Sequence, residues 1–148
     1  MSDYLPSLSS VSTVIGMVGG TVSGLFGEWD GFLQALILFM AVDWILGVVN
    51  ACVFKKSTKT ASGGYSSDVG FKGLVKKCVI LIMILIAAGI DRLVGVSVVR
   101  DAVCIAYIAN ELASILETIG QMGVPIPSVI EKAIDILQAK GDDTSGLQ

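Results

Sequence analysis

Apolar residues are gathered along this chain in long blocks that are separated by short polar stretches. The three clearest blocks occupy residues 32–54, 74–97 and 102–122. An α-helix needs about 20 predominantly apolar residues to cross a bilayer, and each block is close to or above that length. A soluble helix would instead show a narrower apolar stripe with charges along its other face. The pattern predicts an all-α integral membrane protein with three clear hydrophobic helices in a single domain, residues 1–148.

The block at residues 32–54 is the clearest predicted span, and it contains polar groups. Asp43, Gly47 and Asn50 follow one another at i, i+4 and i+7, which places them on one helix face. Polar groups in the hydrocarbon layer are costly and usually face other helices or water. Asp43 therefore either contributes to assembly and gating in a hydrated interior, or only pairs with a basic group or takes up a proton.

The second block follows residues 55–73, which are rich in Ser, Thr and Gly and predict a hydrated loop. This second block, residues 74–97, contains Asp91 and Arg92 near its C-terminal end. We place these two charges at the membrane interface as a local pair, because a charge at the bilayer centre costs about 2.5–3.5 kcal/mol on insertion scales.

The third block, residues 102–122, has a strong helical period with an apolar and a polar face. Either the polar face lines a hydrated pore wall when several copies assemble, or the helix lies at the water boundary. The candidate pore residues on this face are Asn110, Glu111, Ser114 and Glu117.

Two further segments flank these blocks. Residues 8–27 are uncharged and glycine-rich and predict a helix that either spans the bilayer or lies on its surface; the alternative is a flexible leader, because glycine weakens helices in water. A small-residue ridge along this helix permits close packing of helix backbones in a bilayer. Residues 125–140 predict a short amphipathic C-terminal helix, and residues 141–148 a flexible acidic tail. The ridge is formed by Gly16, Gly20 and Gly24.

Composition and charge support the membrane interpretation and add an orientation. The chain is 53% hydrophobic and 16% charged, where soluble domains average about 25% charged residues. The net charge of −3 argues against a nucleic-acid partner. Because cytoplasmic loops are enriched in Lys and Arg, we expect the 55–73 loop on the cytoplasmic side. Six of the ten basic residues mark this region: Lys55, Lys56, Lys59, Lys72, Lys76 and Lys77.

Candidate catalytic chemistry is missing from the sequence. There is no histidine, and the three cysteines occur singly in or beside apolar blocks. No phosphate-binding loop or nucleophile elbow is present either. We therefore expect neither an enzyme nor a bound cofactor or metal. An ion-coupled transporter that uses Asp43 as its coupling carboxylate stays open as an alternative.

Several motifs resemble the holin family of phages of Gram-positive bacteria, to which the clostridial toxin-release holin also belongs. They occur in consistent order between residues 27 and 137. The matching strings are Gly-Glu-Trp-Asp at 27–30, Gln-Ala-Leu-Ile at 34–37, Asp43-x-x-x-Gly47, Gly-Phe-Lys-Gly-Leu-Val-Lys-Lys at 70–77, Ala-Tyr-Ile-Ala-Asn-Glu-Leu-Ala-Ser-Ile-Leu-Glu at 106–117, and Gly-Val-Pro-Ile-Pro at 123–127.

The resemblance implies a function that composition does not supply. Holins accumulate in the host bacterial cytoplasmic membrane as multi-pass proteins and then assemble into homo-oligomeric lesions. These lesions release an endolysin, or in some relatives a toxin, and cause lysis. The implied partners are membrane lipid, further copies of the chain, an endolysin that is released rather than bound, and possibly an antiholin. An antiholin or regulatory membrane subunit is the alternative within this resemblance.

Overall fold

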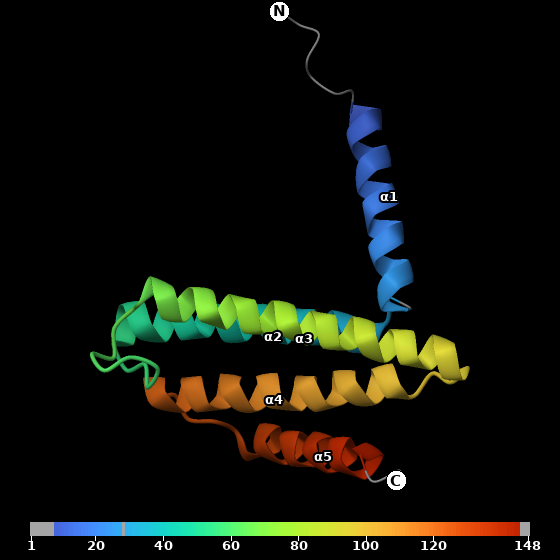
Figure 1. The fold of residues 1–148 in the computed structure, drawn as a ribbon. Helices are drawn as coiled ribbons and strands as arrows, with labels where there is room; N and C mark the ends of the chain where they lie inside the picture. Colours follow the sequence, from blue (N-terminus) through green and yellow to red (C-terminus); the bar gives the residue numbers. More distant parts are fainter. Residues whose placement is uncertain (1–7, 28, 146–148) are drawn as a thin grey trace, which may run out of the picture.

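The computed structural model of this chain describes residues 8–27 and 29–145 and is helical almost throughout (Figure 1). Four helical segments are long and apolar enough to cross a membrane in this part of the chain. The prediction of an all-α membrane protein is confirmed, and the glycine-rich segment qualifies as a fourth candidate span. The elements are α1 (Leu8–Phe26), α2 (Gly31–Val49), a π-helical turn η1 (Asn50–Phe54), α3 (Ser67–Val94), α4 (Val99–Met122) and α5 (Ser128–Ser145).

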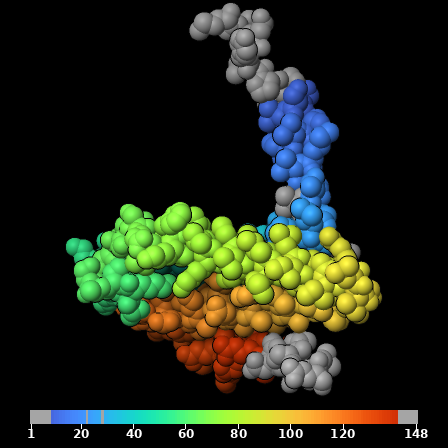
Figure 2. All heavy atoms as spheres, in the orientation of Figure 1, coloured from blue at the N-terminus to red at the C-terminus, as the bar shows by residue number. Residues whose placement is uncertain are grey.

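Helices α2, α3 and α4 pack lengthwise into a bundle, while α1 projects away from it (Figures 1 and 2). The core of the bundle is small and apolar, as expected where lipid covers the outer surface. Exposed aliphatic side chains cover much of α3, among them Val79, Ile82 and Ile86. The core residues are Leu33, Leu36 and Met40 of α2, Ile84 of α3, and Cys104 and Ile108 of α4.

The turn from α1 into α2 is held by charged side chains. Asp30 caps α2 by accepting a hydrogen bond from the Leu33 backbone N–H at 3.0 Å. The other oxygen of Asp30 forms an ion pair with Arg100 of α4. Gly27 has a left-handed φ of +88°, and a Cβ there would lie 2.9 Å from the Arg100 guanidinium. This position therefore needs glycine both for its backbone conformation and for its closeness to Arg100.

Asp91 and Arg92 bind different partners, so the prediction that they form a local pair is wrong. The carboxylate of Asp91 accepts hydrogen bonds from the backbone N–H groups of Val99 and Arg100, at 3.0 and 2.9 Å. Asp91 thereby satisfies the first turn of α4, a role that an N-cap side chain usually has. Arg92 donates instead to backbone carbonyl oxygens at the end of α1, including that of Leu25 at 3.0 Å.

Several element boundaries also differ from the prediction. Helix α3 begins at Ser67, inside the expected 55–73 loop, because Asp68 favours the first helical turn and pairs with Lys72 one turn later at 2.7 Å. Helix α5 continues to Ser145, inside the expected flexible tail, since a glycine within a helix costs only about 1 kcal/mol. The last residues of that tail, 146–148, and Glu28 in the break before α2 lie outside the described residues.

Candidate functional site

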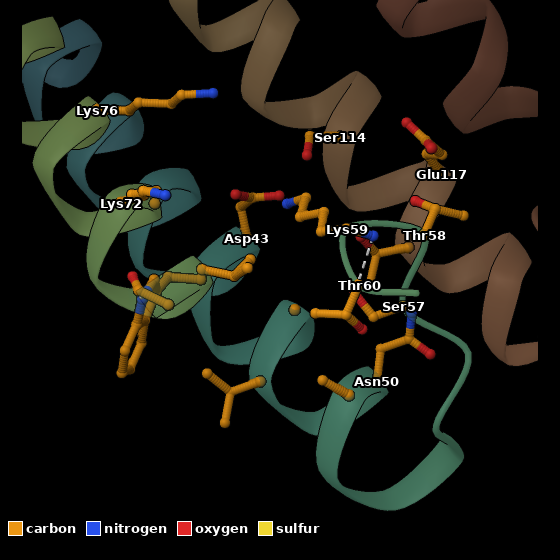
Figure 3. Close-up of a pocket in the computed structure, with 18 of the residues that line it drawn as sticks. Asp43, Asn50, Ser57, Thr58, Lys59, Thr60, Lys72, Lys76, Ser114 and Glu117 are labelled. Carbon is orange, nitrogen blue, oxygen red and sulfur yellow. Dashed lines mark hydrogen bonds between the residues drawn. The ribbon is translucent and has the colours of Figure 1, made fainter. Parts of the chain in front are cut away.

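A cavity of about 490 Å³ lies between α2, α3, α4 and the loop that joins η1 to α3. All seven candidate pore residues line it, although they come from two segments far apart in the sequence. Figure 3 shows Asp43 and Asn50 on one side of the cavity, with Ser114 and Glu117 of α4 on the other. The seven are Asp43, Gly47, Asn50, Asn110, Glu111, Ser114 and Glu117.

One polar group of the cavity is a cluster of three charged side chains, one from each helix of the bundle. The ammonium group of Lys77 on α3 lies 2.8 Å from the Asp43 carboxylate on α2 and also forms an ion pair with Glu111 on α4. The three side chains are only 12%, 11% and 5% exposed, respectively. We call Asp43, Lys77 and Glu111 the charge cluster.

The charge cluster has one cation for two carboxylates. Its formal charge is therefore −1 when all three groups are ionised. The second oxygen of Asp43 is buried and has no hydrogen-bond partner among the described residues. Buried charges are stable only when they are paired and hydrogen-bonded, so Lys77 holds the cluster together, while one oxygen of Asp43 still lacks a hydrogen-bond partner.

A second polar group lies at the loop end of the cavity. Asn50 opens the π-helical turn and donates from its side-chain amide to Gln121 at 2.7 Å. Gln121 in turn donates to Glu117 at 3.1 Å and to Thr58 of the loop at 3.3 Å. These bonds connect the end of α2 to the end of α4. Single-turn π-helical insertions are frequent at functional sites, and this one places Asn50 against α4.

The lysines predicted to set the topology have several different environments. Lys77 is the partly buried centre of the charge cluster, a role that its place in a run of lysines did not indicate. Lys59 reaches from the loop into the cavity, and Lys76 reaches into it from α3 (Figure 3). Lys72 also lines the cavity, where it keeps its exposed pair with Asp68. Lys55 and Lys56 are exposed and lie outside the cavity lining.

The glycine ridge of α1 lies away from this site. A Cβ placed at Gly16, Gly20 or Gly24 would have nothing within 4 Å. The residues on which sequence reasoning placed less weight are Lys77, Gln121 and Thr58. For Gln121 a signal was present, because it follows Glu117 by one helical turn on the polar face. The described residues contain no group of acidic or cysteine side chains that suits a metal ion.

Comparison with known proteins identifies the family. The sequence model of the bacteriophage holin family matches residues 20–139 of this chain. An uncharacterized protein of Listeria innocua is 42% identical over 87% of this chain and 89% of its own length. An uncharacterized protein of Clostridium perfringens is 33% identical over 84% of this chain and 88% of its own length.

One relative has a functional name. The protein named "Probable holin" of Bacillus phage phi105 is 32% identical over 80% of this chain and 82% of its own length. No solved structure matches this chain. The family match covers most of the sequence and agrees with four helices that are apolar enough to span a bilayer. The chain therefore belongs to the bacteriophage holin family, as a multi-pass protein of the cytoplasmic membrane.

Proposed function

We propose that this chain is a holin that oligomerises in the cytoplasmic membrane into lesions through which an endolysin, or a toxin, leaves the cell. Family membership also suggests a role without catalysis. The observation that carries the proposal is the charge cluster, which lies inside a bundle whose outer surface is largely apolar. A single protomer can thus keep its membrane-embedded charges away from lipid. Such a protomer is expected to accumulate without damage.

The same cluster also favours assembly of several copies. Its surplus carboxylate is poorly solvated inside one protomer, and hydration relieves an uncompensated buried charge. If copies associate so that water reaches the unpartnered oxygen of Asp43, this oxygen gains the solvation that it lacks in one protomer. The closed and open arrangements then differ in how Asp43, Lys77 and Glu111 are satisfied. The onset of lysis then depends mainly on Asp43, Lys77 and Glu111.

The test of the proposal is inducible expression in a bacterium together with an endolysin that lacks its own export signal. We expect sudden lysis after a delay, and earlier lysis when the membrane potential is collapsed artificially. Loss of potential with the endolysin retained in the cell would favour the transporter alternative that uses Asp43. If expression of this chain delays the lysis that a second, known holin causes, the antiholin alternative is favoured.

The ridge on α1 gives the first prediction about assembly. Gly20→Leu is expected to reduce cross-linked oligomers and slow triggering, because the side chain would hold two α1 backbones apart. Gly20 has open space around it in the protomer, so the effect must arise between copies. Gly19→Leu is the matched control, since Gly19 also has open space but lies off the ridge. Equal cross-linking of both variants at equal membrane levels would assign α1 a passive role.

The second prediction concerns orientation. Ser62 in the loop before α3 and Ser97 between α3 and α4 are both exposed. The lysines near Ser62 predict that it faces the cytoplasm, so Ser97 should lie outside the cell. In a background without native cysteines, an impermeant thiol reagent added to intact cells should label Ser97→Cys and spare Ser62→Cys. Labelling at position 62 with protection at 97 would reverse the proposed topology.

A further inference from the structure

The cavity lining contains three charged side chains that the charge cluster does not use. Lys77 neutralises Asp43 and Glu111 within the cluster. Lys72 pairs with Asp68, which is not part of the cavity lining. Three exposed charged groups then remain in the lining, and none of them forms an ion pair within the described part of the chain. These three, which we call the free charges, are Lys59, Lys76 and Glu117.

The free charges come from three different segments, with the cations and the carboxylate on different walls. Figure 3 shows Lys76 extending from α3 and Lys59 extending from the loop towards the middle of the cavity. Glu117 lies across the cavity on α4, where it accepts a hydrogen bond from Gln121 at 3.1 Å. A ligand between these walls would therefore meet two ammonium groups at one end and a carboxylate at the other.

Aromatic side chains indicate that this cavity lies near the level of the lipid headgroups. Trp44 and Tyr65 both line it and are 37% and 49% exposed. The indole N–H of Trp44 donates to the backbone carbonyl of Gly70 at 3.3 Å. Trp and Tyr are enriched where the hydrocarbon layer meets water, and basic pockets between membrane helices on the cytoplasmic side bind lipid headgroups. The volume of about 490 Å³ is also within the usual range of ligand sites.

The chemistry of the free charges selects among the common headgroups. A phosphodiester accepts hydrogen bonds from ammonium groups such as those of Lys59 and Lys76. A primary ammonium group donates hydrogen bonds to a carboxylate such as that of Glu117. An ethanolamine phosphodiester carries both groups in one small headgroup. A choline headgroup has a cation without an N–H donor, and a glycerol headgroup has no cation, so each of these matches the site only in part.

We propose that the cavity binds the phosphoethanolamine headgroup of a membrane lipid, with the phosphate on Lys59 and Lys76 and the ammonium group on Glu117. The site uses no member of the charge cluster and requires only that the chain is in a membrane. It therefore goes beyond the proposed release of an endolysin. Because its groups belong to α3, the loop and α4, a bound headgroup links these three segments of one protomer.

Lipid titration of the purified full-length chain in detergent micelles tests the ammonium half of the site, with native mass spectrometry to count bound lipids. We expect phosphatidylethanolamine to bind roughly tenfold more tightly than phosphatidylcholine with the same acyl chains, because only the former donates N–H bonds to Glu117. Glu117→Gln should remove this preference. Glu131→Gln is the matched control, since Glu131 is exposed on α5 outside the cavity lining, and it should retain the preference. Equal binding of both lipids to the wild type would overturn the proposal.

Paired lysine variants test the phosphate half. Lys59→Met with Lys76→Met should weaken phosphatidylethanolamine binding roughly thirtyfold, and arginine at both positions should retain most of the affinity. Lys55→Met with Lys56→Met is the control, because these exposed lysines lie outside the cavity lining. An equal loss in the two methionine pairs would mean that the lipid responds only to general positive charge, and the site would be refuted.

Soluble phosphoethanolamine distinguishes a lipid headgroup from a small free ligand. It carries a phosphate and a primary ammonium group but has no acyl chains. We expect no displacement of bound phosphatidylethanolamine at an equal concentration, because the acyl chains add apolar contact with the helices. Displacement at that concentration would overturn the assignment to a lipid. All of these measurements report binding, so their outcome does not depend on whether the chain lyses cells.

Discussion

Lys77→Met is expected to trigger lysis at a much lower membrane level of the protein than the wild type needs. The substitution leaves Asp43 and Glu111 buried in the bundle without their shared cation. Removing one partner of a buried ion pair typically costs about 3–5 kcal/mol. If hydration in the assembled state relieves that cost, the equilibrium shifts towards assembly by roughly two to four orders of magnitude. The measurement is lysis time against membrane level, with endolysin co-expressed.

Two companion variants show whether the effect arises from the charge cluster. Lys56→Met removes a lysine that is exposed and lies outside the cavity lining, and it should lyse close to the wild-type time. Adding Asp43→Asn and Glu111→Gln to Lys77→Met removes the unpaired carboxylates, so it should restore a delay. Wild-type timing for Lys77→Met alone would mean that the cluster does not stabilise the dispersed protomer.

Asp43→Asn is expected to have the opposite effect, with late lysis or none at a normal membrane level. It removes the surplus negative charge and leaves Lys77 paired with Glu111 alone, a neutral arrangement inside the closed bundle. The dispersed state is then stabilised relative to the hydrated one. Asp43→Leu should delay lysis further, because it also removes the polar group. Both variants are compared with wild type at matched membrane levels in cells that express endolysin.

The control for Asp43 is another aspartate whose charge is fully solvated. Asp68 pairs with Lys72 at the surface, where each side chain is 70% exposed, and exposed pairs contribute little. Asp68→Asn should therefore leave lysis timing unchanged. If Asp43→Asn and Asp43→Leu both lyse on the wild-type schedule, Asp43 does not gate assembly. Its pair with Lys77 would then be only a structural contact.

These opposite expectations follow from one feature, the ratio of charges in the cluster. A neutral buried pair would favour only the closed bundle. Three unpaired charged groups would prevent the closed bundle from forming. Under the proposed function, one cation between two carboxylates stabilises the dispersed protomer and still leaves a gain in solvation on assembly. The Gln121 contacts to Asn50 and Thr58 act at the other end of the cavity and join α4 to the loop. Under the proposed function, we therefore expect both polar groups to exchange partners on assembly.

The sequence alone determined the class of protein and the location of its polar residues. A bilayer of fixed thickness requires apolar blocks of a minimum length, and it penalises polar residues within them. For these reasons the spans, the polar faces and the all-α class follow from the order of residues. The seven candidate pore residues also line one cavity, because their helical spacing placed them on single faces.

Only the tertiary structure decided how these groups are satisfied. Lys77 belongs to a run of lysines that indicates a membrane boundary, yet packing of α3 against α2 and α4 turns it inward between two carboxylates. Arg92 likewise binds α1 instead of its sequence neighbour Asp91. The apolar stripe of α5 showed that it needs a partner surface but did not indicate α4. Long charged side chains reach several helices from one position, so their partners depend on packing angles that no local pattern encodes.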